Sequence, residues 1–319
     1  MRRVVLATLC AATQAWSIKD RGPGIDSVET TFQTRLKDGG KGVTLTYVLA
    51  ACGNEVGELE EDLREDDDAK YLDATELHAA AFGGRADCAE TLVKRGDAVD
   101  AKLNTADWTP MHVAAQGGNA AVVEYLLSAG ADADAAGIDP TPDRPPTQGG
   151  PPPHGFTCLH AAVRSGSLET VQLLLDAGAD LEAESDEKAP LFVAVRQKRC
   201  DIALALLEKG ADANHGASAG LHPVHAATSP DRLACLHALL AHGADANAFD
   251  AHGTTPLRVA AIKGDEMGII NRDVIEALIK AGANAKMDEQ YSRWLKDHPE
   301  VAAANAAAAA EVAAGEEEL

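Results

Sequence analysis

Apolar and polar positions along this 319-residue chain form a block that returns about every 33 residues. In one copy, Thr109–Ala115 (Thr-Pro-Met-His-Val-Ala-Ala) is followed by Leu126, Leu127 and Gly130–Asp132, and another copy begins at Thr157–Ala162. A fixed period of this length is typical of solenoids, in which small units stack on one another. The pattern therefore predicts a long contact surface rather than a closed globule with a catalytic pocket.

Each block predicts two short helices. Thr109 is suited to cap the first helix, and Pro110 stands in the first turn, where its missing N–H costs nothing. Leu126 and Leu127 give the second helix an apolar side. Gly130 follows them, and glycine commonly ends a helix in the left-handed conformation.

The blocks align through one position of the first helix, which is histidine in most copies. The six residues at this position are His78, His112, His160, Phe192, His225 and Arg258. Their spacing is 32 to 34 residues, except that 48 residues separate His112 from His160. An insertion therefore lies between those two copies.

The Thr-Pro-Leu-His-x-Ala-Ala and Gly-Ala-Asp motifs resemble the ankyrin repeat, and the resemblance covers six copies over residues 73–285. It implies an all-α solenoid of stacked helix-turn-helix units with β-turn fingers and a concave binding groove. The fourth copy reads Ala189-Pro190-Leu191-Phe192, without the capping hydroxyl or the histidine, and has Lys198 where other copies have glycine. We expect it to be the least regular copy.

Two insertions interrupt the repeats. Residues 136–156 lengthen one finger, and their many prolines cannot build a packed core, so we expect this segment to be extended or disordered. The second insertion, at residues 266–272, is expected to lengthen the turn between the two helices of the last copy.

The repeats have flanking segments on both sides. Residues 17–42 carry glycine and mixed charges and predict a flexible leader. Residues 43–72 look like a degenerate first unit with an acidic helix, which would cap the stack. Residues 286–319 predict the opposite cap followed by an Ala-rich tail.

Residues 1–16 begin with Met1-Arg2-Arg3, continue with a short apolar run and reach small residues at Ala15, which resembles a signal peptide. This run is too short to span a bilayer. It suggests entry to the secretory pathway or, with Trp16 next, to a secondary plastid. The alternative is an uncleaved N-terminus in the cytoplasm.

The formal charge is −22, which disfavours nucleic acid as a partner. The six cysteines do not look like a disulfide framework, and we expect Cys88 and Cys235 to be unpaired core residues, which favours a reducing destination. We expect a monomer that spans no membrane.

The aligned histidines allow two interpretations: a metal ladder, or imidazoles that bond to neighbouring backbone and tie the fingers to the helices. The second is favoured, because no other ligand type accompanies them. Asp132–Gly137 only faintly resembles a calcium loop. There is no phosphate-binding glycine loop, no HExxH motif and no distinguished nucleophile, so we expect no catalytic, cofactor or metal site.

In ankyrin repeats, partners often contact a finger residue four before the histidine position and a helix residue four after it. By this resemblance, the candidate partner-binding residues are Trp108, Phe156 and Lys188 in the fingers and Phe82, Gln116, Arg164 and Arg196 in the helices. Two interpretations of Trp108 and Phe156 remain open: exposed anchors for a partner, or rings packed against neighbouring fingers.

The predicted function is protein–protein binding, as an adaptor, scaffold or regulatory inhibitor, to a partner with an acidic segment. The alternatives are a structural spacer without a specific partner and an enzyme that uses the groove.

Overall fold

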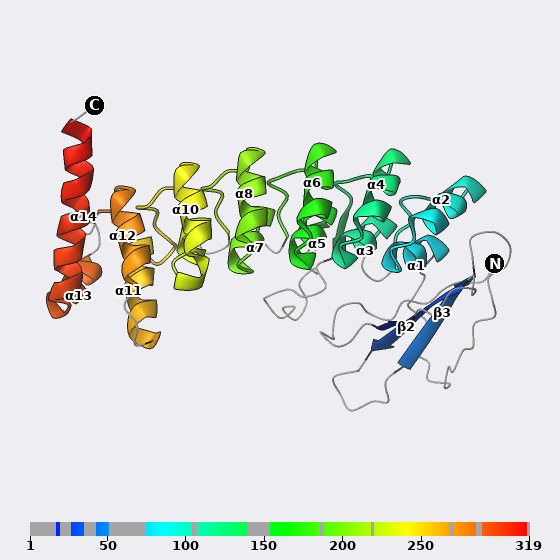
Figure 1. Ribbon diagram of the computed structural model, residues 1–319, viewed down its shortest axis with the longest axis horizontal. Coiled ribbons are helices and arrows are strands. Elements are labelled where there is room, and N and C mark those ends of the chain that lie inside the picture. Colours follow the sequence, from blue (N-terminus) through cyan, green and yellow to red (C-terminus); the bar gives the residue numbers. More distant parts are fainter. Residues whose placement is uncertain are drawn as a thin grey trace. The chain divides into compact units, whose positions relative to one another are not determined.

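The computed structural model describes residues 17–19, 27–34, 43–50, 75–103, 107–138, 154–185, 188–217, 220–267, 271–284 and 289–317. The chain divides into two compact units, Met1–Asp180 and Leu181–Leu319. Each unit is built mainly from pairs of helices (Figure 1). In the described residues, no helix is both long enough and apolar enough to cross a membrane.

The first unit contains three helix pairs. These are α1 (Glu76–Phe82) with α2 (Ala86–Arg95), α3 (Pro110–Gly117) with α4 (Ala120–Ser128), and α5 (Cys158–Ser165) with α6 (Leu168–Asp176). The first helices pack in the order α1, α3, α5, and the second helices in the order α2, α4, α6 (Figure 1). The apolar positions of the pattern, such as Leu126 and Leu174, are fully buried between them.

The second unit is also built mainly from pairs of helices. Its elements are α7 (Pro190–Arg196), α8 (Cys200–Glu208), α9 (Pro223–Ala226), the 3₁₀ turn η3 (Pro230–Arg232), α10 (Leu233–Ala241), α11 (Pro256–Met267), α12 (Arg272–Lys280), α13 (Glu289–Asp297) and α14 (Pro299–Glu317). The last pair, α13 and α14, packs against α11 and α12, with Tyr291 buried.

The first helix of each pair starts where the sequence pattern places it. Thr75, Thr109 and Thr157 are extended N-cap residues, and in each case the histidine three residues later bonds back to the threonine. Two donors that a helix start would leave unpaired are therefore satisfied together. The prediction of the helix starts is confirmed at these three repeats.

The structure differs from the prediction at the N-terminal side. Strands β1 (Ser17–Lys19), β2 (Ser27–Thr34) and β3 (Val43–Ala50) form an antiparallel sheet in the order β1-β2-β3. A flexible leader was expected for 17–42, and a helical unit from residue 43. Val43–Ala50 is rich in β-branched and aromatic residues, which favour a strand over a short helix. Residues 1–16 and the acidic segment at 51–72 lie outside the described residues.

The first insertion is also more ordered at its ends than predicted. Strand β4 (Ala136–Ile138) pairs antiparallel with β5 (His154–Thr157), so the two ends of the insertion form a hairpin stem. The proline-rich residues 139–153 lie outside the described residues. In the last repeat, α11 runs on to Met267, so described residues of the second insertion extend a helix rather than a turn.

The fifth repeat, not the fourth, is the least regular. Lys198 takes the left-handed conformation that glycine has elsewhere, with a φ of 64°, and α7 and α8 are both complete. In the fifth repeat α9 has only 4 residues. Pro230 explains this, because the residue before a proline is driven away from helical angles, and Ser229 is extended.

The expectation of unpaired cysteines is wrong at Cys88 and Cys235. Cys200 and Cys235 form a disulfide, and Cys88 is also disulfide-bonded. Cys158 is free and fully buried. Cys88 and Cys235 occupy apolar core positions of their repeats, and a bond between two repeats leaves no signal within a single copy.

Candidate functional site

The aligned histidines join each first helix to the finger of the next repeat. The Nε2–H of His78 donates to the carbonyl oxygen of Trp108 at 3.1 Å, and that of His112 donates to the carbonyl of Phe156 at 2.9 Å. His225 does the same to Thr254 at 3.0 Å. The interpretation that these imidazoles tie fingers to helices is confirmed.

The other ring nitrogen of each histidine is occupied too. The backbone N–H of Thr75 donates to Nδ1 of His78, and that of Thr109 donates to Nδ1 of His112, both at 3.2 Å. Burial lowers the pKa of both His78 and His112 to about 4. A neutral ring with both nitrogens bonded has no lone pair left for a metal. The described residues contain no group of three or more His, Cys, Asp or Glu side chains that could hold a metal ion.

Trp108 and Phe156 are buried, and the expectation that they stand exposed as partner anchors is wrong. Their exposed fractions are 1% and 0%. The two rings stack in parallel with centroids 5.6 Å apart, and His112 and His160 extend the stack. The indole N–H of Trp108 donates to the carbonyl of Ile138 in β4 at 3.0 Å. These side chains therefore hold the hairpin stem on the repeats.

Three candidate residues occupy equivalent positions in the first unit. Phe82, Gln116 and Arg164 stand in the last turns of α1, α3 and α5, which pack side by side in that order. All three side chains are half-buried. The guanidinium of Arg164 lies over the ring of Phe156, 4.8 Å from its centroid, and this contact favours the observed position of the cation. The carbonyl oxygen of Gln116 is buried and has no hydrogen-bond partner among the described residues.

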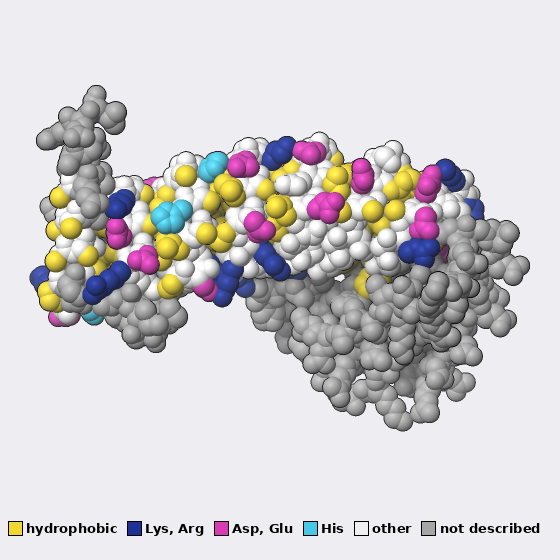
Figure 2. Space-filling view, viewed as in Figure 1, with side chains coloured by type: hydrophobic (Ala, Val, Ile, Leu, Met, Phe, Trp, Pro, Cys, Tyr) yellow, Lys and Arg dark blue, Asp and Glu magenta, His cyan; other side chains and the backbone are white. Residues whose placement is uncertain are grey.

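The remaining candidates, Lys188 and Arg196, belong to the second unit. Lys188 precedes α7 and is half-buried, and Arg196 is the last residue of α7 and is exposed. On the face drawn in Figure 2, basic side chains lie near the lower end of α7 and also over other helices, interspersed with acidic side chains.

Sequence reasoning missed a second set of bonds between repeats. The side chains four residues after each Gly of the Gly-Ala-Asp motif accept backbone N–H bonds from the next repeat. The pairs are Asp100 with Asp132, Asp134 with Asp180, Glu182 with Asp212, Asn214 with Asp245, and Asn247 with Asn284. Asp132 and Asp134, which faintly resembled a calcium loop, bond to backbone amides instead. The sequence does contain a signal for these bonds, because a polar side chain that can accept a hydrogen bond recurs at the same position of successive copies.

Models of a known repeat family match most of this region. "Ankyrin repeats (3 copies)" matches residues 42–136 and 144–217, and "Ankyrin repeats (many copies)" matches residues 224–279. The chain belongs to the ankyrin repeat family. The first match begins at residue 42, so it includes the segment predicted as a degenerate ankyrin unit, although the structure has a strand at Val43–Ala50.

Solved ankyrin structures are similar to the chain. The ankyrin repeat domain of human ASB11 is 29% identical, with a TM-score of 0.54, over 67% of this chain and 86% of that chain. An ankyrin repeat domain from Acinetobacter baumannii AYE is 23% identical, with a TM-score of 0.54, over 66% and 98%, and shows the fold alone. No curated protein matches the chain. Ankyrin repeats are in general protein–protein interaction modules.

Proposed function

We propose that this ankyrin repeat protein is a non-enzymatic module that binds a protein partner through its first helices and fingers. The observation that carries the proposal is the row formed by Phe82, Gln116 and Arg164 at equivalent positions of α1, α3 and α5. The row combines an aromatic side chain, an amide with an unpartnered oxygen and a cation that lies over an aromatic ring. Aromatic residues and arginine are the types that contribute most to binding energy at interfaces.

The partner is proposed to present an acidic segment. Arg164 in the first unit and Lys188 and Arg196 in the second unit are basic residues in a chain of formal charge −22. Local positive charge on a negative body steers acidic segments toward those positions and repels them elsewhere. Trp108 and Phe156 act indirectly in this proposal, since the Phe156 ring supports Arg164.

Charge reversal tests this proposal. Protein carrying Arg164→Glu and Arg196→Glu is used as bait beside the wild type, and captured proteins are quantified by mass spectrometry. The matched control is Lys94→Glu with Lys280→Glu, which changes the net charge equally on the second helices α2 and α12. Both control lysines form exposed i,i+4 ion pairs, which contribute little to stability.

The expected result is a set of proteins that the wild type and the control capture and the Arg164→Glu/Arg196→Glu protein loses. Their association with the wild type should slow as salt is raised. Equal capture by all three baits would contradict the proposed face. The absence of any reproducible partner would favour a structural spacer.

A further inference from the structure

The fifth repeat lacks part of the framework that the other repeats have. The first helices α1, α3, α5 and α7 have 7 or 8 residues, whereas α9 has 4. Where the second and third repeats use Gly118 and Gly166 in the left-handed conformation to turn between helices, the fifth has Pro230-Asp231 and a 3₁₀ turn. The fifth repeat therefore lacks the last turn of its first helix, and the 3₁₀ turn η3 leads into α10.

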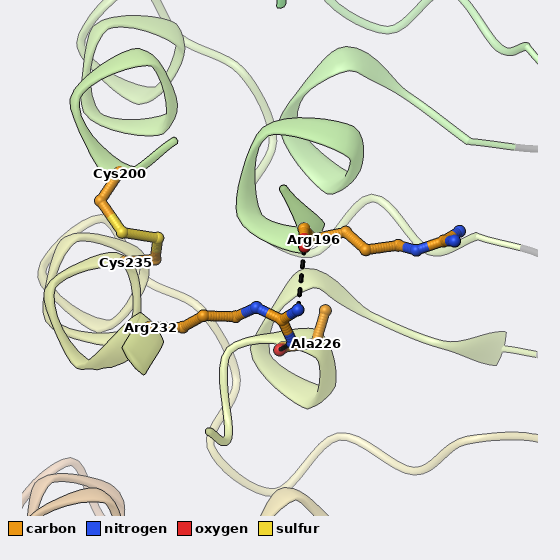
Figure 3. Close-up of a disulfide and its surroundings, with 5 residues drawn as sticks. All are labelled: Arg196, Cys200, Ala226, Arg232 and Cys235. Atoms are coloured by element: carbon orange, nitrogen blue, oxygen red, sulfur yellow. Dashed lines mark hydrogen bonds between the residues drawn. A yellow bond between two sulfur atoms is a disulfide. The ribbon is translucent and has the colours of Figure 1, made fainter. Parts of the chain in front are cut away.

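Arg232 compensates for part of this loss. Its Nη1 donates to the carbonyl oxygen of Ala226 at the end of α9, and its Nη2 donates to the carbonyl of Arg196 at the end of α7 (Figure 3). Asn119 in the second repeat makes the equivalent contact with α1, by donating to the carbonyls of Ala81 and Phe82. Arg232 thus ties the short helix to the fourth repeat.

The disulfide supplies the second tie. Cys200 is the first residue of α8 and Cys235 lies in the first turn of α10, and their Cα atoms are 4.7 Å apart. The two helices belong to consecutive repeats and pack side by side in the second unit. Figure 3 shows the disulfide and the Arg232 contacts at the same junction between the fourth and fifth repeats.

We propose that the Cys200–Cys235 disulfide is a redox-sensitive lock, and that its reduction loosens the fifth repeat while the rest of the stack stays folded. Cys235 is fully buried and Cys200 is half-buried, so Cys200 is the more exposed residue of the pair and its Sγ is the expected point of attack. Because α9 is short, fewer other contacts hold the fifth repeat in place. The disulfide between α8 and α10 therefore contributes a larger share of its stability than a disulfide between two complete repeats would.

A dithiol can serve as the reductant. One thiolate of the dithiol attacks Sγ of Cys200, the S–S bond breaks, and Cys235 leaves as a thiolate. The second thiol of the reductant then displaces Cys200 and forms the reductant's own disulfide. Two electrons and two protons pass from the dithiol to the two cysteines, which end as thiols.

Hydrogen–deuterium exchange on the full chain tests the lock. We expect dithiothreitol to speed exchange of the amides in α9 and α10 by about tenfold or more, with α6, which carries no cysteine, unchanged. A Cys200→Ser/Cys235→Ser protein should exchange fast at α9 and α10 with or without the reductant. A Cys88→Ser protein should respond to dithiothreitol as the wild type does, which separates this bond from the other disulfide.

Thiol alkylation followed by mass spectrometry reports the state of each cysteine in the same samples. The lock is refuted if exchange in α9 and α10 stays slow once Cys200 and Cys235 are shown to be reduced. It is also refuted if both cysteines alkylate fully in protein that was unfolded without reductant, because the bond would then not exist. Global unfolding on reduction, with α6 exchanging as fast as α10, would contradict the local character of the lock.

Discussion

At the residue scale, the buried histidines show how the repeat uses a polar side chain without exposing it. His78 and His112 each bond to threonine through Nδ1 and to the next finger through Nε2. A ring bonded in this way is neutral, and protonation would remove the acceptor at Nδ1. Burial therefore couples the charge state of these rings to the folding of the stack.

The resulting prediction concerns acid. The folded-state pKa of His78 and His112 is lowered to about 4, below the ordinary 6.5, so the unfolded chain binds more protons in this window. Their contribution to stability is complete above pH 6.5 and is lost as the pH falls toward 4, at about 1.4 kcal/mol per pH unit for each ring. Urea titrations at pH 7, 6, 5 and 4.5 measure this slope.

Replacement of one ring provides the control for the acid prediction. Phe192 occupies the same position in the fourth repeat, so His112→Phe tests whether a non-titrating ring is tolerated there. The variant should be less stable at pH 7. Between pH 6 and 5 its free energy of unfolding should fall less steeply than that of the wild type, by about 1.4 kcal/mol per pH unit. An unchanged slope would mean that His112 does not titrate in this window.

Trp108 gives a second prediction at this scale. Because its ring is buried, Trp108→Ala should lower the free energy of unfolding by about 3–5 kcal/mol, as truncation of a large core side chain does. Trp108→Phe keeps a ring but leaves the carbonyl of Ile138 without its donor, at a cost of about 1–3 kcal/mol. Denaturant titration measures both. Unchanged stability with loss of partner capture would restore Trp108 as an exposed anchor.

At the element scale, the two ends of the long finger are ordered as paired strands, although the proline-rich sequence of the finger predicts an unpacked segment. The stem of β4 and β5 pairs in an antiparallel ladder, and Ile138 accepts the indole N–H of Trp108. The prediction of an unpacked segment failed at these ends, since it considered the composition of residues 136–156 as a whole. The pairing depends on an aromatic partner some 30 residues earlier, which local composition does not reveal.

Two deletions test the role of the stem. Replacement of residues 140–152 by Asn-Gly should change the free energy of unfolding by less than about 1 kcal/mol, because closure entropy depends only weakly on the length of a connecting segment. Deletion of 138–153 also removes Ile138 and should be clearly more destabilising. Circular dichroism and denaturant titration compare the two proteins. Equal stabilities would show that the stem contributes nothing to the stack.

At the scale of the whole molecule, the period of the sequence predicted the helix pairs, their starts and their buried leucines, because those features depend on local chemistry that recurs in each copy. It did not predict the Cys200–Cys235 bond, the clamp of Arg232 or the burial of Trp108. Each of these depends on contacts between repeats that a single copy does not specify. Phe82, Gln116 and Arg164 stand at equivalent positions of α1, α3 and α5, as the register predicted, and their role in partner binding stays a prediction.

We expect a protein partner to bind the first helices and fingers rather than the second helices. Hydrogen–deuterium exchange of the chain with and without a captured partner distinguishes the two faces. Exchange should slow in the last turns of α1, α3, α5 and α7 and in the following fingers, and stay unchanged in α2, α4, α6 and α8. Protection confined to the second helices would contradict it.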